Sequence, residues 1–320
     1  MKKVKLFTHT DMDGIGCSIL GILAYGKENI NIEYCNYNDI NEKVKEFYIG
    51  SEKNEYDKIF ITDISVNKKV ATIIEQYYTD ETCNPSTQLL DHHPTALELN
   101  EYDWAKVQIN LNDKEKTSGT RMFYDYLKEN GGLNSYQTTY ERCINLYDFI
   151  EIVRRYDIWQ WKADNDLIPK QWNDLFYIMG REDFIKSILY RLTHYDIFDF
   201  SDFDLKLLEY KQREINNYIE SKDKELIVKN ILGYKAGIIF GEQYHSEVGN
   251  RLSEIHPELD FIVIINMSKA ISYRNIGNKV NLGKDVAEIF GGGGHPNASG
   301  SPISNETRSN LINELFNLKF

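Results

Sequence analysis

Aspartates and histidines that could bind a metal ion follow three apolar segments of strand length. These residues are His9, Asp11, Asp13, Asp63, Asp91, His92 and His93. In extended backbone, residues two apart point to the same side, so His9, Asp11 and Asp13 can converge on one point. Carboxylates brought together in this way repel one another unless a cation lies between them. Carboxylate and imidazole ligands without a thiolate suit manganese or magnesium better than a structural zinc ion.

Two other binding motifs do not fit the first of these clusters. An EF-hand loop aligned on Gly14 places Leu20 at the twelfth position, where a bidentate glutamate is required. A dinucleotide-binding fingerprint fails because its third glycine position holds Ile19. A lone Asp-x-Asp is more typical of a helix cap, and a lone pair of histidines is more typical of a polar loop. Their shared position at strand ends favours a metal site.

A second group of candidate residues lies in the segment GGGGHPNASG, residues 291–300. The segment is not a phosphate-binding Walker loop, because no Gly-Lys-Ser/Thr follows its glycines. Four glycines allow left-handed backbone, and their N–H groups can form a nest for an anion. A mobile loop or a helix C-cap is the alternative. Arg274 is a candidate bidentate phosphate ligand or, alternatively, one partner of a surface ion pair.

The elements that would position the first cluster alternate between strand and helix patterns. The expected strands cover residues 4–8, 30–37, 58–64 and 87–93, with helical patterns between them. Such alternation is typical of an α/β fold with a doubly wound, mostly parallel sheet. Ligands of these sheets bind beyond the carboxyl ends of the strands, where the metal-ligating residue types occur.

The rest of the chain indicates a second, smaller α/β domain after a helical region. Residues 117–192 have helical apolar spacing, and residues 204–226 form a charged pattern typical of a connecting helix. Strand and helix patterns alternate again from residue 236, and a last helix is expected from about residue 305. The predicted divisions are a metal-binding domain over 1–195, a connecting segment over 196–228 and a smaller domain over 229–320.

The charge of the chain argues against a long nucleic-acid duplex as its partner. The 320 residues include 37 Lys+Arg and 49 Asp+Glu, for a net charge of -12. Residues 228–320 hold nine residues of each sign, so the acidic excess lies upstream of them. Proteins that bind long duplexes are normally basic, because their Lys and Arg side chains displace counterions from the phosphates of the nucleic acid. Most of the excess is expected to be solvated surface.

Hydropathy and cysteine spacing indicate a cytoplasmic protein without a membrane partner. No stretch of about eighteen apolar residues occurs, and the N-terminal sequence becomes polar too early for a signal peptide. The four cysteines are at least eighteen residues apart, which fits neither a metal knuckle nor a disulfide framework. They are Cys17, Cys35, Cys83 and Cys143, and we expect unpaired thiols.

Five features in this order resemble the DHH family of phosphoesterases with a C-terminal DHHA1 domain. They are HTDMDG at 9–14, Asp63, DHH at 91–93, Asp157 in RRYDIWQW, and GGGGHPNASG with Arg274 upstream. The resemblance spans nearly the whole chain and is greatest to the nano-RNases related to oligoribonuclease B. The spacing His9-Thr10-Asp11 argues against the inorganic pyrophosphatase branch. The resemblance implies a DHH catalytic domain followed by a DHHA1 substrate-binding domain.

The resemblance implies a centre of two divalent metal ions, with Mn²⁺ preferred over Mg²⁺. One ion would be held by His9, Asp11 and Asp63, and the other by Asp13, His92 and Asp157, with Asp63 bridging. His93 would face the scissile phosphate, and Asp91 would orient the two histidines. The substrate-binding residues would be Arg274, Gly291, Gly292, Gly293, Gly294 and His295, with Asn297 and Ser299 in the same loop.

The function implied by this resemblance is hydrolysis of short oligoribonucleotides, of about two to five nucleotides, to mononucleotides. The attacking group would be a hydroxide shared by the two ions. A phosphatase acting on 3′-phosphoadenosine-5′-phosphate and a cyclic (di)nucleotide phosphodiesterase are alternatives on the same centre. The non-enzymatic alternative is a nucleotide-sensing domain. Cleavage direction, base preference and oligomeric state, a homodimer included, stay open.

Overall fold

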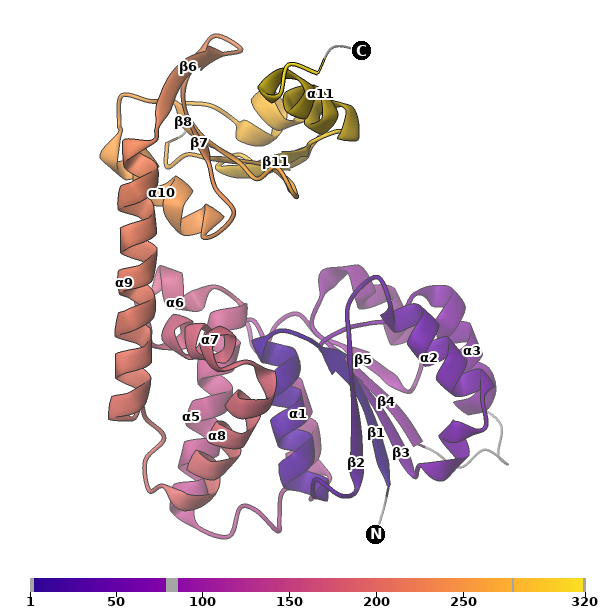
Figure 1. The fold of residues 1–320 in the computed structure, drawn as a ribbon. Helices are drawn as coiled ribbons and strands as arrows, with labels where there is room; N and C mark the ends of the chain where they lie inside the picture. The colour runs from indigo at the N-terminus through magenta and orange to yellow at the C-terminus, as the bar shows by residue number, and fades with distance from the viewer. Residues whose placement is uncertain (1–2, 79–85, 278, 319–320) are drawn as a thin grey trace. The chain divides into compact units, whose positions relative to one another are not determined.

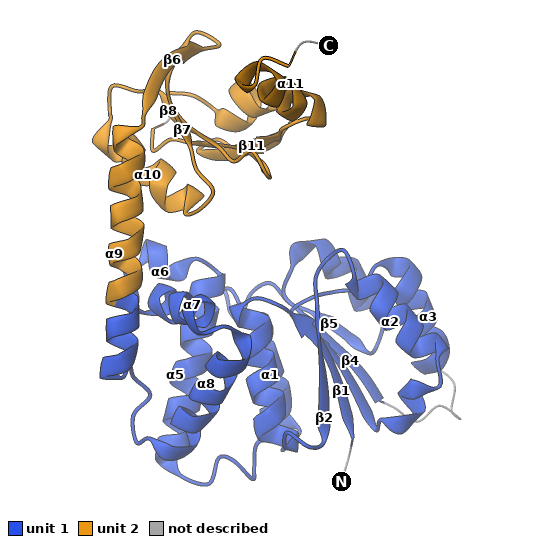
Figure 2. Ribbon diagram, viewed as in Figure 1, with its two compact units in different colours: residues 1–208 blue, residues 209–320 orange. Residues whose placement is uncertain are grey.

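The computed structural model describes residues 3–78, 86–277 and 279–318 (Figure 1). Its chain divides into two compact units, Met1–Leu208 and Glu209–Phe320 (Figure 2). The division falls within helix α9 (Asp202–Lys224), the long charged helix expected from the sequence. The domain limits expected from the sequence, with a connecting segment over 196–228, stay a prediction. None of the helices in the described residues is long and apolar enough to cross a membrane.

Unit 1 is built on a five-stranded parallel sheet with the order β2-β1-β3-β4-β5. The strands are β1 (Val4–His9), β2 (Ile30–Cys35), β3 (Lys58–Thr62), β4 (Ser86–Asp91) and β5 (Ala105–Val107). From β1 the chain continues to β2 on one side, while β3 lies on the other side of β1. In such sheets this reversal opens a crevice at the carboxyl ends of the strands, which is the usual ligand site.

Helices cover both faces of the parallel sheet (Figure 1). One face carries α1 (Met12–Tyr25) and α4 (Gly119–Glu129), and the other carries α2 (Ile40–Ile49) and α3 (Lys68–Tyr78). The two faces bury separate apolar clusters: Leu6 belongs to the first and Phe7 to the second. This follows from the alternation of side chains along a strand. The predicted doubly wound α/β fold is confirmed.

The expected helical region of unit 1 extends the first of these clusters. Its helices are α5 (Tyr140–Asp157), α6 (Gln160–Ala163), α7 (Ile168–Met179) and α8 (Arg181–His194). Phe149 of α5, Trp172 of α7 and Ile188 of α8 are buried in the same cluster as α1. Helix α5 therefore packs beside α1, and Asp157 is its last residue.

Unit 2 is the predicted smaller α/β domain, with a six-stranded mixed sheet of order β10-β11-β9-β8-β7-β6. The strands are β6 (Ile227–Ile231), β7 (Tyr234–Phe240), β8 (Phe261–Ile265), β9 (Ala270–Arg274), β10 (Gly293–His295) and β11 (Ala298–Pro302). Helix α10 (His245–Ile255) covers one face together with Ile215 and Ile219 of α9. A π-helical turn, Leu282–Ala287, covers the other face, a 3₁₀ turn, Glu288–Phe290, follows it, and α11 (Asn305–Leu315) comes last.

The glycine segment differs from the loop expected from its sequence. Residues 293–295 and 298–302 form an antiparallel hairpin in which Gly293 is paired with Gly300. A Cβ atom on Gly292, just before β10, would lie 2.0 Å from the carbonyl oxygen of Gly300, so the chain approaches β11 too closely for a side chain there. Gly291 has a φ of +71° and ends the preceding 3₁₀ turn. The strands Gly-Gly-His and Ala-Ser-Gly-Ser-Pro have no alternation of large apolar and polar side chains, and sequence patterns therefore missed this pair.

Candidate metal centre

The carboxyl edge of the parallel sheet brings together residues from three adjacent strands. His9 is the last residue of β1, Asp63 follows β3, and Asp91 is the last residue of β4. Because parallel strands end at the same edge, residues far apart in the sequence meet at the crevice. Two groups of three side chains at this edge have ligand atoms within 4.8 Å of one another. These groups are His9–Asp11–Asp63 and Asp13–His92–Asp157.

The first group surrounds the imidazole of His9. Its Nδ1 atom lies 2.7 Å from Asp11 Oδ2 and 3.9 Å from Asp63 Oδ2. Asp11 is also the N-cap of α1, because its Oδ1 accepts a hydrogen bond from the Gly14 N–H at 3.1 Å. The helix cap therefore fixes the direction of a carboxylate whose other oxygen points at His9.

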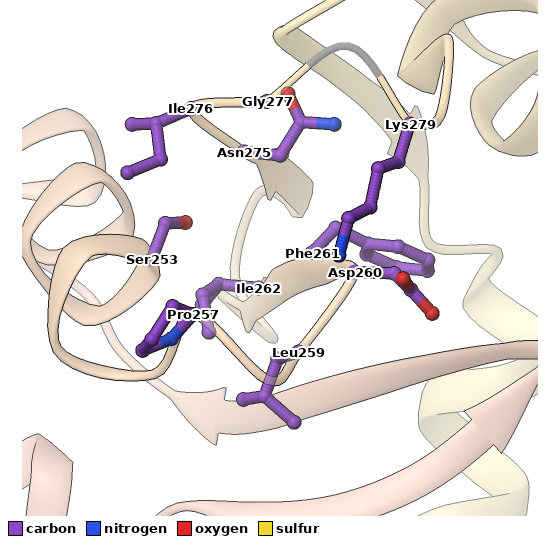
Figure 3. A pocket seen from close by; sticks show the side chains of 10 residues that line it. All are labelled: Ser253, Pro257, Leu259, Asp260, Phe261, Ile262, Asn275, Ile276, Gly277 and Lys279. Atoms are coloured by element: carbon purple, nitrogen blue, oxygen red, sulfur yellow. The ribbon is translucent and has the colours of Figure 1, made fainter.

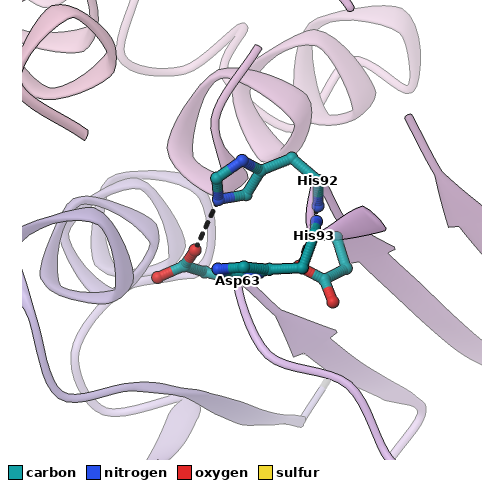
Figure 4. Close-up of side chains that lie close together, drawn as sticks. Asp63, His92 and His93 are labelled. Carbon is teal, nitrogen blue, oxygen red and sulfur yellow. Dashed lines mark hydrogen bonds and ion pairs between the residues drawn. The ribbon is translucent and has the colours of Figure 1, made fainter. Parts of the chain in front are cut away.

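The second group surrounds the imidazole of His92. Its Nε2 atom lies 3.4 Å from Asp157 Oδ2 and 3.6 Å from Asp13 Oδ2. The same atom lies 3.2 Å from Asp63 Oδ1, so Asp63 is near both groups. Figure 4 shows the ring of His92 directed at the carboxylate of Asp63. The arrangement leaves His9 and His92 on two sides of one buried carboxylate.

Asp63 occupies a strained and crowded position between the two groups. It has a φ of +59°, a left-handed conformation that aspartate adopts more readily than most other residues. Its side chain is 1% exposed, and its Oδ2 atom is buried without a hydrogen-bond partner. A Cβ atom on Gly119 would lie 2.4 Å from the Asp63 Cβ, so only glycine leaves room for this carboxylate. A buried carboxylate oxygen without a donor fits coordination to a cation.

Two of the carboxyl groups have pKa values far above their usual range. Burial, followed by the charges of Asp13 and Asp11, raises the pKa of Asp63 well above its ordinary value. The same causes raise the pKa of Asp157 to about 8. By contrast, the pKa of Asp11 is lowered, because the hydrogen bond and charge of His9 outweigh its burial. Each of these buried carboxyl groups disfavours ionisation of the others. A divalent cation between them would stabilise their ionised forms.

His93 and Asp91 form a hydrogen-bonded pair, and with Asp63 and His92 they make a third group whose ligand atoms lie within 4.8 Å of one another. Asp91 Oδ1 lies 2.7 Å from His93 Nδ1 and accepts hydrogen bonds from the backbone N–H groups of His92 and His93 at 2.8 and 3.3 Å. The hydroxyl of Ser65 donates to its other oxygen. The hydrogen bond to Asp91 raises the pKa of His93. Asp91 therefore fixes the ring of His93 and favours its protonated form, with Nε2 directed away from Asp91.

The structure adds partners for Asp13 that the sequence patterns did not identify. Its carboxylate accepts hydrogen bonds from the backbone N–H groups of Gly119 at 2.6 Å and Thr120 at 2.9 Å, in the first turn of α4. The hydroxyl of Thr120 also donates to the backbone oxygen of Asp13 at 2.6 Å. Unpaired N–H groups at a helix start favour a negative charge. Ser118, the N-cap of α4, is a residue type that indicates where a helix starts, but it does not indicate that this start would bind Asp13.

The predicted substrate-binding residues lie together in unit 2. The Arg274 guanidinium donates to the backbone oxygen of Tyr273 at 2.9 Å and to the Ser246 hydroxyl at 3.4 Å. No carboxylate among the described residues forms an ion pair with it. Arg274 is paired with Ala298 of β11, and the hydroxyl of Ser299 is buried without a partner. Gly291, Gly293, Gly294, His295 and Asn297 are exposed, and Gly292 is half-buried.

A pocket of about 280 Å³ in unit 2 lies beside Arg274, whose backbone oxygen accepts a hydrogen bond from the Ser253 hydroxyl at 3.4 Å (Figure 3). Ser253 of α10, Phe261 of β8 and Lys279 are among the residues that line it. None of the metal-ligating or substrate-binding residues predicted from the sequence belongs to its lining.

Comparison with known proteins finds relatives and solved structures that match over nearly the whole chain, while no family model matches. The oligoribonuclease NrnB of Bacillus subtilis (strain 168) is 37% identical over 316 residues, which are 98% of this chain and 76% of that protein. A 3′,5′-cyclic-nucleotide phosphodiesterase of Helicobacter pylori is 24% identical over 99% of both chains. The pGpG-specific phosphodiesterase PggH of Vibrio cholerae covers 98% of each chain with a TM-score of 0.53 and 16% identity, a likeness that shows the fold.

Proposed function

The chain belongs to the DHH phosphoesterases of the oligoribonuclease NrnB branch, and on this premise we propose that it hydrolyses short oligoribonucleotides to mononucleotides. The observation that carries the proposal is the pair of ligand groups on either side of Asp63, in a chain 37% identical to an oligoribonuclease. A net charge of -12 favours substrates of about two to five nucleotides, because longer polyanions need more basic contacts.

Two Mn²⁺ ions are the cofactors we propose for this centre, with Mg²⁺ as the alternative. His9, Asp11 and Asp63 would hold one ion, and Asp13, His92 and Asp157 the other, with Asp63 shared. The oxygen-rich ligand sets and the unpartnered Asp63 Oδ2 support this assignment. When bound, divalent cations supply Lewis acidity to phosphoryl oxygens and lower the pKa of water.

The residues around the centre would position and polarise the phosphodiester. His93 would donate a hydrogen bond from Nε2 to the scissile phosphate, since its Nδ1 atom faces Asp91. Asp91 would hold this ring in place and favour its protonated state, as the raised pKa of His93 supports. The first turn of α4 would keep the Asp13 carboxylate directed at His92.

The substrate clamp that we propose in unit 2 consists of Arg274, the glycines at 291–294 and His295. An arginine without a carboxylate partner among the described residues fits an anionic ligand. Gly291, Gly293 and Gly294 are exposed, so a ligand can approach the backbone there without side chains in the way, while the N–H groups of Gly291 and Gly292 donate to Glu288 and Ala287. Free thiols at Cys17, Cys35 and Cys143 support a cytoplasmic location, while Cys83 lies outside the described residues.

The test is turnover of a substrate panel by the manganese-loaded protein. The panel holds RNA dimers to pentamers, a long RNA, cyclic mono- and dinucleotides and 3′-phosphoadenosine-5′-phosphate. We expect the dimers to pentamers to be cleaved to mononucleotides with the highest kcat/KM. Cleavage of the bisphosphorylated nucleoside alone would refute the proposal. Nucleotide binding without any turnover would instead assign a sensing role.

Cyclic nucleotides are the second candidate substrates, because the 24% identical relative from Helicobacter pylori is named for them. The same panel distinguishes the two candidates. A higher kcat/KM for a cyclic nucleotide than for any linear dimer would make it the principal substrate.

A further inference from the structure

Tyr37 lies at the carboxyl edge of the sheet but belongs to neither ligand group. Strand β2 ends at Cys35, which is paired with His9 on β1, so the turn after β2 starts beside the first ligand group. Thr10 donates a hydrogen bond to Asn36 Oδ1 at 2.9 Å, and the Asn36 N–H donates to Asp39 Oδ1 at 2.7 Å. The turn that carries Tyr37 is therefore tied both to the metal-ligating loop and to the start of α2.

The ring of Tyr37 contacts two histidines of the site. Its centroid lies 5.0 Å from that of His9 with the planes tilted by 50°, and 6.1 Å from that of His93, edge-on at 88°. Its hydroxyl oxygen lies 3.3 Å from His93 Nε2, the nitrogen that faces away from Asp91. Tyr37 thus connects a candidate metal ligand with the residue proposed to contact the phosphate.

Packing does not account for this position of Tyr37. The residue is 61% exposed and belongs to neither of the two apolar clusters of the described part of unit 1. Removal of an exposed ring from solvent is favourable when a second flat surface covers it. A phosphodiester held at His93 would bring such a surface, because a nucleobase lies on each side of it.

We propose that Tyr37 is a substrate-contacting residue whose exposed ring face stacks on a nucleobase flanking the scissile phosphate. This inference rests on the proposed function and extends it to the substrate's bases. Stacking on an aromatic side chain contributes about 1–3 kcal/mol per base and tolerates every base, because each has a flat face. A short substrate makes few phosphate contacts, so one stacked base supplies a large share of its affinity. The hydroxyl of Tyr37 orients His93 before the phosphate arrives.

Tyr37→Ala, Tyr37→Phe and a control, Tyr140→Ala, would test the stacking contact. Tyr140 is 76% exposed and begins α5, about 25 Å along that helix from Asp157. The substrates are a diribonucleotide and two analogues of it, each lacking the base on one side of the phosphate. Measured values are kcat, KM and bound manganese per chain.

The stacking contact predicts a loss that depends on the base. Tyr37→Ala should raise KM for the diribonucleotide about 10- to 100-fold. For one of the abasic analogues it should change KM less than about twofold, with bound manganese as in the wild type. Tyr37→Phe should keep the wild-type KM, because the ring remains, and should lower only kcat. Tyr140→Ala should change neither constant.

Other outcomes separate the failure of this inference from the failure of the proposed function. Equal effects of Tyr37→Ala on all three substrates, or no effect, would overturn the stacking contact while the function stands. The same holds if the base-dependent loss occurs in Trp159→Ala, another exposed aromatic residue of unit 1, and not in Tyr37→Ala. If the wild type cleaves no oligoribonucleotide, the function fails. The stacking contact is then tested by ligand binding. Tyr37→Ala should weaken the binding of AMP and leave the binding of ribose 5-phosphate unchanged.

Discussion

The two units place a histidine beside carboxylates with opposite consequences for its charge. In unit 1, His92 lies within 3.6 Å of carboxylate oxygens from Asp13, Asp63 and Asp157, yet burial lowers its pKa. In unit 2, the more exposed His256 lies 2.6 Å from Asp223, and this hydrogen bond raises its pKa. Burial thus outweighs the attraction of several carboxylates. A neutral imidazole is the form that binds a metal ion, whereas His256 is half of an ion pair.

The two units also differ in the sign of the charged groups that lack partners among the described residues. Unit 1 gathers the carboxylates of Asp11, Asp13, Asp63 and Asp157, and one buried oxygen has no donor. Unit 2 holds Arg274, which has no carboxylate partner among the described residues. The first unit therefore has the chemistry to receive cations, and the second an anion. Changes to these carboxylates of unit 1 should alter metal content, whereas changes to Arg274 in unit 2 should alter substrate affinity alone.

The largest effect is expected from Asp63→Asn, which keeps the shape of the side chain and its tolerance of positive φ. Activity should fall roughly a thousand-fold or more, with loss of bound manganese, because the carboxylate near both ligand groups is removed. Without metal, the variant should be more stable than the wild type above pH 5. The raised pKa of Asp63 means that its ionisation opposes folding, and asparagine removes that cost.

Activity assays, manganese content and melting temperatures with and without a chelator measure these outcomes. Asp57→Asn is a matched control, because Asp57 precedes β3 at the opposite edge of the sheet. Wild-type manganese content in Asp63→Asn would contradict the assignment of this residue as a ligand.

Gly119→Ala should have the next largest effect. The added Cβ would lie 2.4 Å from the Asp63 Cβ and 2.8 Å from its Cα, so the ligand must move. A displacement of this order lowers kcat by about a hundredfold, and manganese affinity should fall with it. Gly277→Ala is the control, because its added Cβ has no atom within 4 Å. Equal activity of the two variants would show that Asp63 does not need its present position.

Arg274→Ala should raise KM about 10- to 100-fold, because a charge-assisted hydrogen bond to the substrate is lost. Bound manganese should stay at the wild-type level, in contrast to the two changes in unit 1. The control is Arg251→Ala on α10, an exposed residue paired with Glu254 at 2.8 Å. An unchanged KM would remove Arg274 from the clamp, and a lost metal ion would contradict the division of roles between the units.

The smallest effect is expected from Asp223→Asn, which removes the carboxylate that raises the pKa of His256 in unit 2. The pKa of His256 should fall toward its ordinary value, as followed by NMR titration of its ring. A histidine with a raised pKa stabilises the fold below its unfolded value of about 6.5, and this contribution is lost as the pH rises through the folded pKa. The variant should therefore lose under about 1 kcal/mol at pH 5 and nothing at pH 9. A constant loss across this range would point to packing instead.

Local pattern was sufficient to predict much of the fold and part of the site. The strands β1 and β3 are mostly apolar, and β4 holds the apolar pair Leu89 and Leu90. Residues of metal-ligating types lie at or just after the ends of these strands, so both the sheet and its reactive edge could be inferred. Asp157 could not be selected by spacing, because it lies in an acidic helical region, and it was implied only by the resemblance. The glycine hairpin was missed because its strands lack the large apolar side chains that reveal a period of two.

The amino-acid sequence by itself determined the types of group at the strand ends, the acidic balance and the elements that carry them. Only the tertiary structure decided that the backbone of Gly119 and Thr120 holds Asp13, more than a hundred residues earlier in the chain. The same is true of Tyr37, which reaches His93 across 56 residues of sequence. The physical reason is that periodicity records which face of an element is buried. It does not record which distant backbone or ring will meet that face.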